Sequence, residues 1–165
     1  MSIDKRSMAS EESRTRPDIA SSSPTLHILA DTNVVLDLLL GRQPWLAAAQ
    51  PMWEARDTGR LRLYLPASAL TDIFYVARKL VGFAGAKHVV ETCLLGFSIV
   101  GVDRHILAAA LTLPGNDYED NVQIACAQSA ALDLIVTRNR ADFAHSPILA
   151  VEPAEILRRL SQPLG

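Results

Sequence analysis

Apolar and polar residues form blocks along the chain that predict strands and helices in turn. Short apolar runs of strand length cover residues 26–30, 61–65, 97–102, 134–137 and 148–151. The stretches between them carry apolar residues at helical spacing or lie between helix-ending Gly and Pro residues. These stretches predict helices over residues 34–40, 44–58, 67–80, 84–95, 105–113, 118–131 and 153–160. Such alternation is typical of an α/β three-layer sandwich with a mainly parallel central sheet.

Residues 1–25 lack this pattern. Serines alternate there with charged residues, and Pro17 and Pro24 interrupt the segment. A segment of this composition buries too little apolar surface to fold on its own, so the sequence predicts a flexible tail. One domain over residues 26–165 remains, which fits the usual single-domain size of about 100–150 residues.

The charge of the chain is close to balanced, with 16 basic and 18 acidic residues and a pI near 6.1. Proteins held to nucleic acid by bulk charge usually have a pI above about 9, so any such contact must come from local patches. No run approaches the roughly 20 apolar residues of a membrane span, and the start lacks the apolar core of a signal peptide. The two cysteines lack metal or redox spacing. We therefore expect a cytoplasmic protein without a membrane segment.

Carboxylates gather near the predicted carboxyl ends of the strands, where open parallel sheets bind their ligands. Asp31 follows the first strand, and Asp72 lies early in the helix after the second. Asp120 lies at the start of the helix before the fourth strand, and Asp142 shortly follows that strand. Clustered carboxylates raise one another's pKa values unless cations neutralise them. Oxygen ligands in this number favour Mg²⁺ or Mn²⁺, which support phosphodiester chemistry in acidic pockets.

Three motifs in this order resemble the PIN domain, a fold of metal-dependent ribonucleases. They read ADTNVVLD at residues 30–37, DYED at residues 117–120 before an Ala-rich helix, and IVTRNRADF at residues 135–143. The resemblance covers residues 27–150 or so and implies an RNA substrate. Most small bacterial members are VapC-type toxins of toxin–antitoxin pairs, which implies a small antitoxin protein as partner. We also expect a homodimer, formed through the Ala- and Leu-rich helices.

Carried over residue by residue, the resemblance implies metal binding by Asp31, Asp120 and Asp142, with Asp72 as a fourth catalytic residue. Asp72 departs from the pattern, because the family usually has glutamate there and aspartate is one methylene shorter. Asn139 also departs, because many members carry aspartate after the Thr-Arg pair. Supporting roles around the site are predicted for Asn33, Asp37, Asp117, Glu119, Thr137 and Asn139.

Several of these residues also have a purely structural interpretation. Asp31 and Asp117 can cap helices, with Thr32 or Asn33 as the cap expected for the first one. Asp37 can be a solvated surface residue, and Thr137 can satisfy the backbone at a strand end. Most of the arginines fit an ordinary solvated surface; those nearest the predicted site are candidates for RNA phosphate contacts, namely Arg42, Arg138 and Arg140.

The leading hypothesis is a Mg²⁺- or Mn²⁺-dependent endoribonuclease that acts as a toxin. The alternative is a catalytically inactive PIN domain that serves as an RNA- or protein-binding module, which the departures at Asp72 and Asn139 favour. A phosphotransferase with an aspartyl nucleophile at a strand end is a third hypothesis. That chemistry usually needs an acid two residues after the nucleophile, and Asn33 occupies this place.

Overall fold

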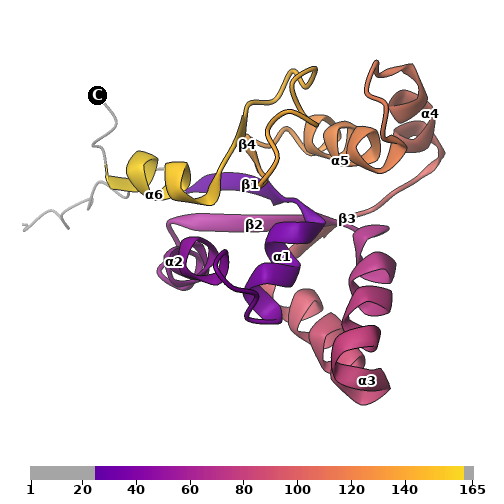
Figure 1. Ribbon diagram of the computed structural model, residues 1–165. Helices are drawn as coiled ribbons and strands as arrows, with labels where there is room; N and C mark the ends of the chain where they lie inside the picture. Colours follow the sequence, from indigo (N-terminus) through magenta and orange to yellow (C-terminus); the bar gives the residue numbers. More distant parts are fainter. Residues whose placement is uncertain (1–24, 162–165) are drawn as a thin grey trace, which may run out of the picture.

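Five strands form an entirely parallel sheet in the order β3-β2-β1-β4-β5 (Figure 1). The computed structural model describes residues 25–161, so the flexible tail predicted for residues 1–25 lies outside the described residues except for its last position. The strands are β1 (Leu26–Ala30), β2 (Leu61–Pro66), β3 (Ser98–Val100), β4 (Leu134–Val136) and β5 (Ala150–Val151).

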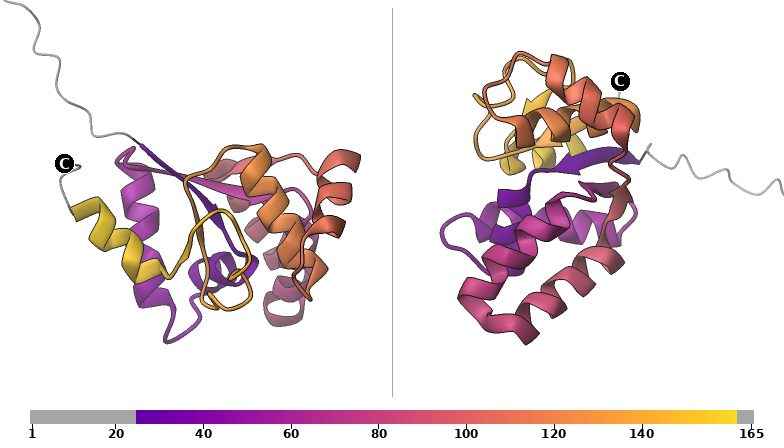
Figure 2. Two further views of the ribbon diagram at one scale, coloured as in Figure 1. Left: turned by 90° about the horizontal axis from the view of Figure 1, so that it is seen from above. Right: turned by 90° about the vertical axis from the view of Figure 1, so that its right-hand side faces the viewer.

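Helices cover both faces of the sheet, which confirms the predicted three-layer α/β sandwich (Figures 1 and 2). One face carries α1 (Thr32–Leu39), α2 (Leu46–Asp57), α3 (Ala69–Gly96) and α6 (Pro153–Ser161). The other carries α4 (Arg104–Thr112) and α5 (Tyr118–Ser129). Among residues 25–161, no helix combines the length and the apolar composition needed to cross a membrane.

The central strand β1 contributes to both hydrophobic cores. Ile28 and Ala30 pack with the α1, α2 and α3 layer, whereas Leu29 packs with the α4 and α5 layer. All three side chains are at most 1% exposed. Burial on both faces explains why the strand reads as a continuous apolar run, and each large side chain buried in this way contributes about 1.5–3 kcal/mol.

Several element boundaries differ from the sequence-based prediction. Helix α1 begins at Thr32 with Asp31 as its N-cap, so the prediction of Thr32 or Asn33 as the cap was wrong. Helix α2 begins at Leu46 rather than at residue 44, and the third strand shortens to Ser98–Val100. The helices predicted over residues 67–80 and 84–95 form one bent element, α3.

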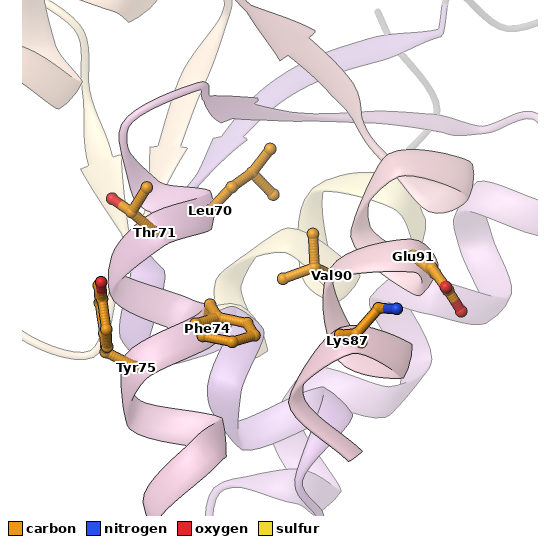
Figure 3. Close-up of a pocket in the computed structure, with 7 residues that line it drawn as sticks. All are labelled: Leu70, Thr71, Phe74, Tyr75, Lys87, Val90 and Glu91. Carbon is orange, nitrogen blue, oxygen red and sulfur yellow. The ribbon is translucent and has the colours of Figure 1, made fainter. Parts of the chain in front are cut away.

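The bend in α3 occurs at Gly82, whose φ of 75° and ψ of 178° are not helical. This region of backbone space is open essentially to glycine alone. The two halves of α3 enclose an apolar groove of about 420 Å³ (Figure 3). Its lining residues come from both halves and are Leu70, Thr71, Phe74, Tyr75, Lys87, Val90 and Glu91.

Candidate active site

Asp31 is held in place by hydrogen bonds from three separate segments. Thr137 Oγ1 donates to Asp31 Oδ2 over 2.9 Å, and Gln123 Nε2 lies 3.5 Å from Oδ1. The backbone N–H of Asn33 also donates to Oδ1, at 3.4 Å. The residue is only 7% exposed, and this burial raises the pKa of its carboxyl, an effect that the three hydrogen bonds oppose.

Thr137 orients the carboxylate of Asp31 and does not face solvent. It is fully buried, and its hydroxyl accepts from the backbone N–H of Asn139 at 3.0 Å while it donates to Asp31. The backbone N–H of Asp31 in turn donates to Val136 O over 2.9 Å. The carboxyl ends of β1 and β4 are thus locked together at this point.

Gln123 is a site residue that the sequence reasoning missed. It lies on α5, is 2% exposed and has a buried Oε1 with no hydrogen-bond partner among residues 25–161. Seven consecutive residues of α5, from Asn121 to Ala127, are buried. The available signal was the position of Gln123, three residues after Asp120 and therefore close to it on the helix.

The start of α5 presents three carboxylates within four residues. Asp117 is the N-cap and accepts from the backbone N–H of Glu119 at 2.8 Å. Burial raises the pKa of Asp120 to about 7, and the negative charges of Asp117, Asp31 and Asp142 add to the effect. The structural interpretation of Asp117 is therefore correct, while its charge also acts on Asp120.

Asp72 approaches the same site from α3. Burial raises the pKa of Glu119, and the negative charge of Asp72 is the next largest cause. Thr32 Oγ1 donates to Glu119 Oε1 over 3.3 Å, which ties the start of α5 to the start of α1. Asp72 itself is exposed.

Asp142 lies in a turn fixed by Asn139. Asn139 Nδ2 donates to Asp142 Oδ2 over 2.6 Å, and its Oδ1 accepts from the backbone N–H of Ala141 at 3.3 Å. The carboxylates of Asp117, Asp120 and Asp142 line one cavity of about 290 Å³. The structure thus brings together acids from the start of α5 and the segment after β4, and the negative charge of Asp31, directly after β1, also acts on Asp120.

The predicted ligands fit Mg²⁺ or Mn²⁺ in their chemistry, because all of them are carboxylates and no basic side chain of the described residues forms an ion pair with Asp31, Asp120 or Asp142. In the positions that residues 25–161 adopt, however, no three Asp, Glu, His or Cys side chains are arranged to hold one ion together. Asp142 is exposed and Asp120 is partly exposed.

Two of the three arginines predicted to contact RNA are already engaged by Asp37. Arg138 Nη1 lies 3.3 Å from Asp37 Oδ2, and Arg42 Nη1 lies 3.8 Å from Oδ1. Asp37 is 1% exposed, so the interpretation of this residue as solvated was wrong. Arg140 and Asn33 are exposed. The role of each arginine towards RNA stays a prediction.

Acids at the carboxyl-end rim of a five-stranded parallel sheet define an α/β protein with an acidic candidate site. The family model of the PIN domain matches residues 27–141. The chain therefore belongs to the PIN-domain family. A search of curated proteins gives no match.

Solved structures of similar fold include VapC toxins in complex with their antitoxins. The DNA-bound VapBC complex of Salmonella typhimurium matches with a TM-score of 0.62 and 18% identity, over 78% of this chain and 99% of that one. A toxin–antitoxin complex of Klebsiella pneumoniae gives 0.58 and 24%, over 76% and 97%. A sarcin–ricin loop cleaving VapC toxin of Mycobacterium tuberculosis gives 0.59 and 11%, over 71% and 93%.

Proposed function

We propose that this protein is a divalent-metal-dependent endoribonuclease and the toxin of a toxin–antitoxin pair. The observation that carries the proposal is the cavity lined by Asp117, Asp120 and Asp142, where burial and the neighbouring negative charges raise the pKa of Asp120 to about 7. Without a cation this arrangement is electrostatically unfavourable, so it is best explained by a site that works with bound positive charge.

In this proposal Asp31, Asp120 and Asp142 hold Mg²⁺ or Mn²⁺, and Asp72 assists through Glu119. A divalent ion supplies a nucleophile from water at neutral pH and stabilises charge on the leaving oxygen. The chain's own part is to orient ligands: Thr137 and Gln123 fix the carboxylate of Asp31. Such supporting contacts typically affect metal affinity or activity by about 10–100-fold.

An RNA substrate is supported by the structural similarity to the sarcin–ricin loop cleaving toxin. An antitoxin partner is supported by the similarity to complexes that contain one. The apolar groove between the halves of α3 is the surface we propose for that partner, because Leu70, Phe74 and Val90 are available there to pack against an apolar helix (Figure 3).

The test is RNA cleavage by metal-free protein before and after addition of Mg²⁺ or Mn²⁺. We expect cleavage only with the ion, and a loss of at least about 100-fold in Asp31→Asn and Asp120→Asn. Asp57→Asn is the matched control, because Asp57 is an exposed acid of α2 that pairs with Arg56. It lies outside the acid cluster, by which we mean Asp31, Asp117, Asp120 and Asp142. Full activity in both site variants would refute the proposed mechanism.

The second candidate is an inactive PIN domain that binds RNA or protein. It is favoured by the spacing of the carboxylates, no three of which are arranged to hold an ion in the described part of the chain. Calorimetric titration with millimolar Mg²⁺ and Mn²⁺ separates the two. Heat of binding that disappears in Asp120→Asn supports the nuclease, and its absence in the unaltered protein supports the binding module.

A further inference from the structure

A second cavity, of about 180 Å³, lies on the α1 and α2 side of the sheet near the acid cluster. Its walls come from α1, the start of α2, the residue Arg138 shortly after β4, and the residues that follow β5. Helices α2 and α6 lie side by side here (Figure 2). We call this cavity the Trp45 recess, and its polar and aromatic lining residues are Asp37, Trp45, Arg138 and Glu152.

The recess contains a buried acceptor that lacks a hydrogen bond. Asp37 is 1% exposed, and its Oδ2 makes no hydrogen bond with any described residue. Arg138 Nη1 lies 3.3 Å from this oxygen but without the alignment of a hydrogen bond. The same nitrogen donates to Asp37 Oδ1 over 3.4 Å, so Asp37 fixes Arg138 at the wall of the recess, and its own buried carboxylate is not open to a ligand.

The charges around the recess favour a neutral ligand over a cation. Arg138 and Arg42 both pair with Asp37, and Glu152 is the second carboxylate of the lining. Two guanidinium groups therefore balance two carboxylates. A further cation, such as an arginine side chain from a partner protein, gains no net attraction from this set.

The recess also has a wall suited to a flat ring. The guanidinium carbon of Arg138 lies 4.2 Å from the centre of the Trp45 ring, and Trp45 is 46% exposed. Unstacked RNA bases bind against aromatic rings and guanidinium planes of this kind. The volume of about 180 Å³ is below the range of about 300–1,000 Å³ for drug-sized ligands, so a single base suits it better than a whole nucleotide.

The recess and the acid cluster are connected through two consecutive residues. Thr137 donates to Asp31, and the next residue, Arg138, forms the wall of the recess. The positive charge of Arg138 also acts on the carboxyl of Asp31. A strand of RNA with a phosphate at the acids can therefore place a neighbouring base in the recess.

We infer that the Trp45 recess is a base-binding subsite selective for guanine, an inference that rests on the proposed ribonuclease function. Guanine alone among the four RNA bases presents two adjacent N–H donors, N1–H and N2–H, beside a carbonyl oxygen. The two oxygens of the Glu152 carboxylate can accept both donors while the ring packs against Trp45. Adenine, cytosine and uracil each lack part of this pattern.

The test measures binding alone, in the Asp31→Asn variant with chelator, so that no cleavage occurs. The probes are two fluorescein-labelled uridine oligonucleotides, one with a single central guanine and one with adenine in its place, followed by fluorescence anisotropy. We expect the guanine RNA to bind about tenfold more tightly. Glu152→Gln and Trp45→Ala, added separately, should reduce this ratio to about one.

Glu54→Gln is the matched control, because Glu54 is an exposed carboxylate on α2 outside the recess and the ratio in this variant should stay unchanged. Equal affinity for the two RNAs, or a ratio unaffected in both recess variants, would overturn the inference. Quenching of Trp45 fluorescence by ethylguanidinium in a Trp53→Phe background, without any guanine preference, would instead assign the recess to a protein partner and overturn it too.

Different results would refute the ribonuclease function and the guanine subsite. Metal-dependent cleavage without a guanine preference would remove only the subsite. A guanine preference in a protein that cleaves no RNA would leave the subsite standing and refute the nuclease.

Discussion

At the scale of single residues, the site consists of carboxyl groups whose surroundings disfavour the ionised form. Asp31, Glu119 and Asp120 all have pKa values above the ordinary range, with burial as the largest cause in each case. Each of these groups binds a proton more readily in the folded than in the unfolded chain. The stability of the metal-free protein must therefore depend on pH.

The direction of this dependence follows from Asp120, whose pKa rises to about 7 in the folded protein. Its contribution to stability is fully present below the unfolded pKa of about 3.9 and is lost as the pH rises through about 7. We expect metal-free protein to unfold at lower urea concentration at about pH 8 than at about pH 5. Asp120→Asn should reduce this difference and stabilise the protein at the higher pH.

Urea unfolding in chelator, with the two proteins compared at each pH, provides the measurement. Comparison with the variant cancels the contributions of histidines and other groups common to both proteins. An identical pH dependence in the two proteins would show that folding does not raise the pKa of Asp120.

Residue-level patterns in the sequence located the acids and some of the groups that hold them, such as Thr137, but not Gln123. Asp31 is recognisable because an acid directly after an apolar strand is conspicuous. Gln123, by contrast, lies within a helix rich in alanine, and its bond to Asp31 spans 92 positions. Asp37 and Arg138 are 101 positions apart. Such contacts depend on how the sheet brings distant segments together, and a single sequence does not show which distant residues meet.

At the scale of elements, α3 owes its bent shape to one residue. The sequence predicted two helices with a break between residues 80 and 84, and the structure places the break at Gly82. The helix-spacing pattern could not show that the halves face each other, because that depends on the φ of 75° at Gly82. The apolar groove between the halves is a direct result of this turn.

Gly82→Ala tests the bend. A Cβ at this position would have no heavy atom within 4 Å, so any cost comes from the backbone conformation alone. That cost is about 1–3 kcal/mol in the free energy of unfolding. Gly101→Ala is the matched control, because its Cβ also meets nothing and its φ is ordinary; we expect a change within about 0.5 kcal/mol.

Denaturant unfolding of both glycine variants gives the comparison. Equal stabilities for Gly82→Ala and Gly101→Ala would mean that the bend tolerates an ordinary residue, and that α3 is shaped by packing rather than by its glycine.

At the scale of the whole molecule, charge limits how RNA can be bound. The chain carries 16 basic and 18 acidic residues, and Asp37 engages both Arg42 and Arg138. Of the three predicted phosphate contacts, Arg140 alone is without an ion pair within the described residues. Affinity for RNA should therefore rest on few phosphate contacts.

The salt dependence of RNA binding measures this property. Each phosphate contact to a single strand contributes about −0.7 to the slope of log affinity against log salt, so a slope of about −1 to −2 is expected. Arg140→Gln should make the slope shallower by about 0.7. Fluorescence anisotropy in the Asp31→Asn background is the measurement, and a steep slope that Arg140→Gln leaves unchanged would contradict the assignment.

The pairing of β1 with β4 also has a consequence for the order of events during synthesis. The first strand pairs with β2 early, but it finds its second neighbour only after more than a hundred further residues, since Ile28 pairs with Leu134. A nascent chain that ends before β4 already contains Asp31, Asp72 and Asp120 but lacks Thr137, which orients the first of them. The candidate site is thus incomplete until β4 and the residues that follow it have been synthesised.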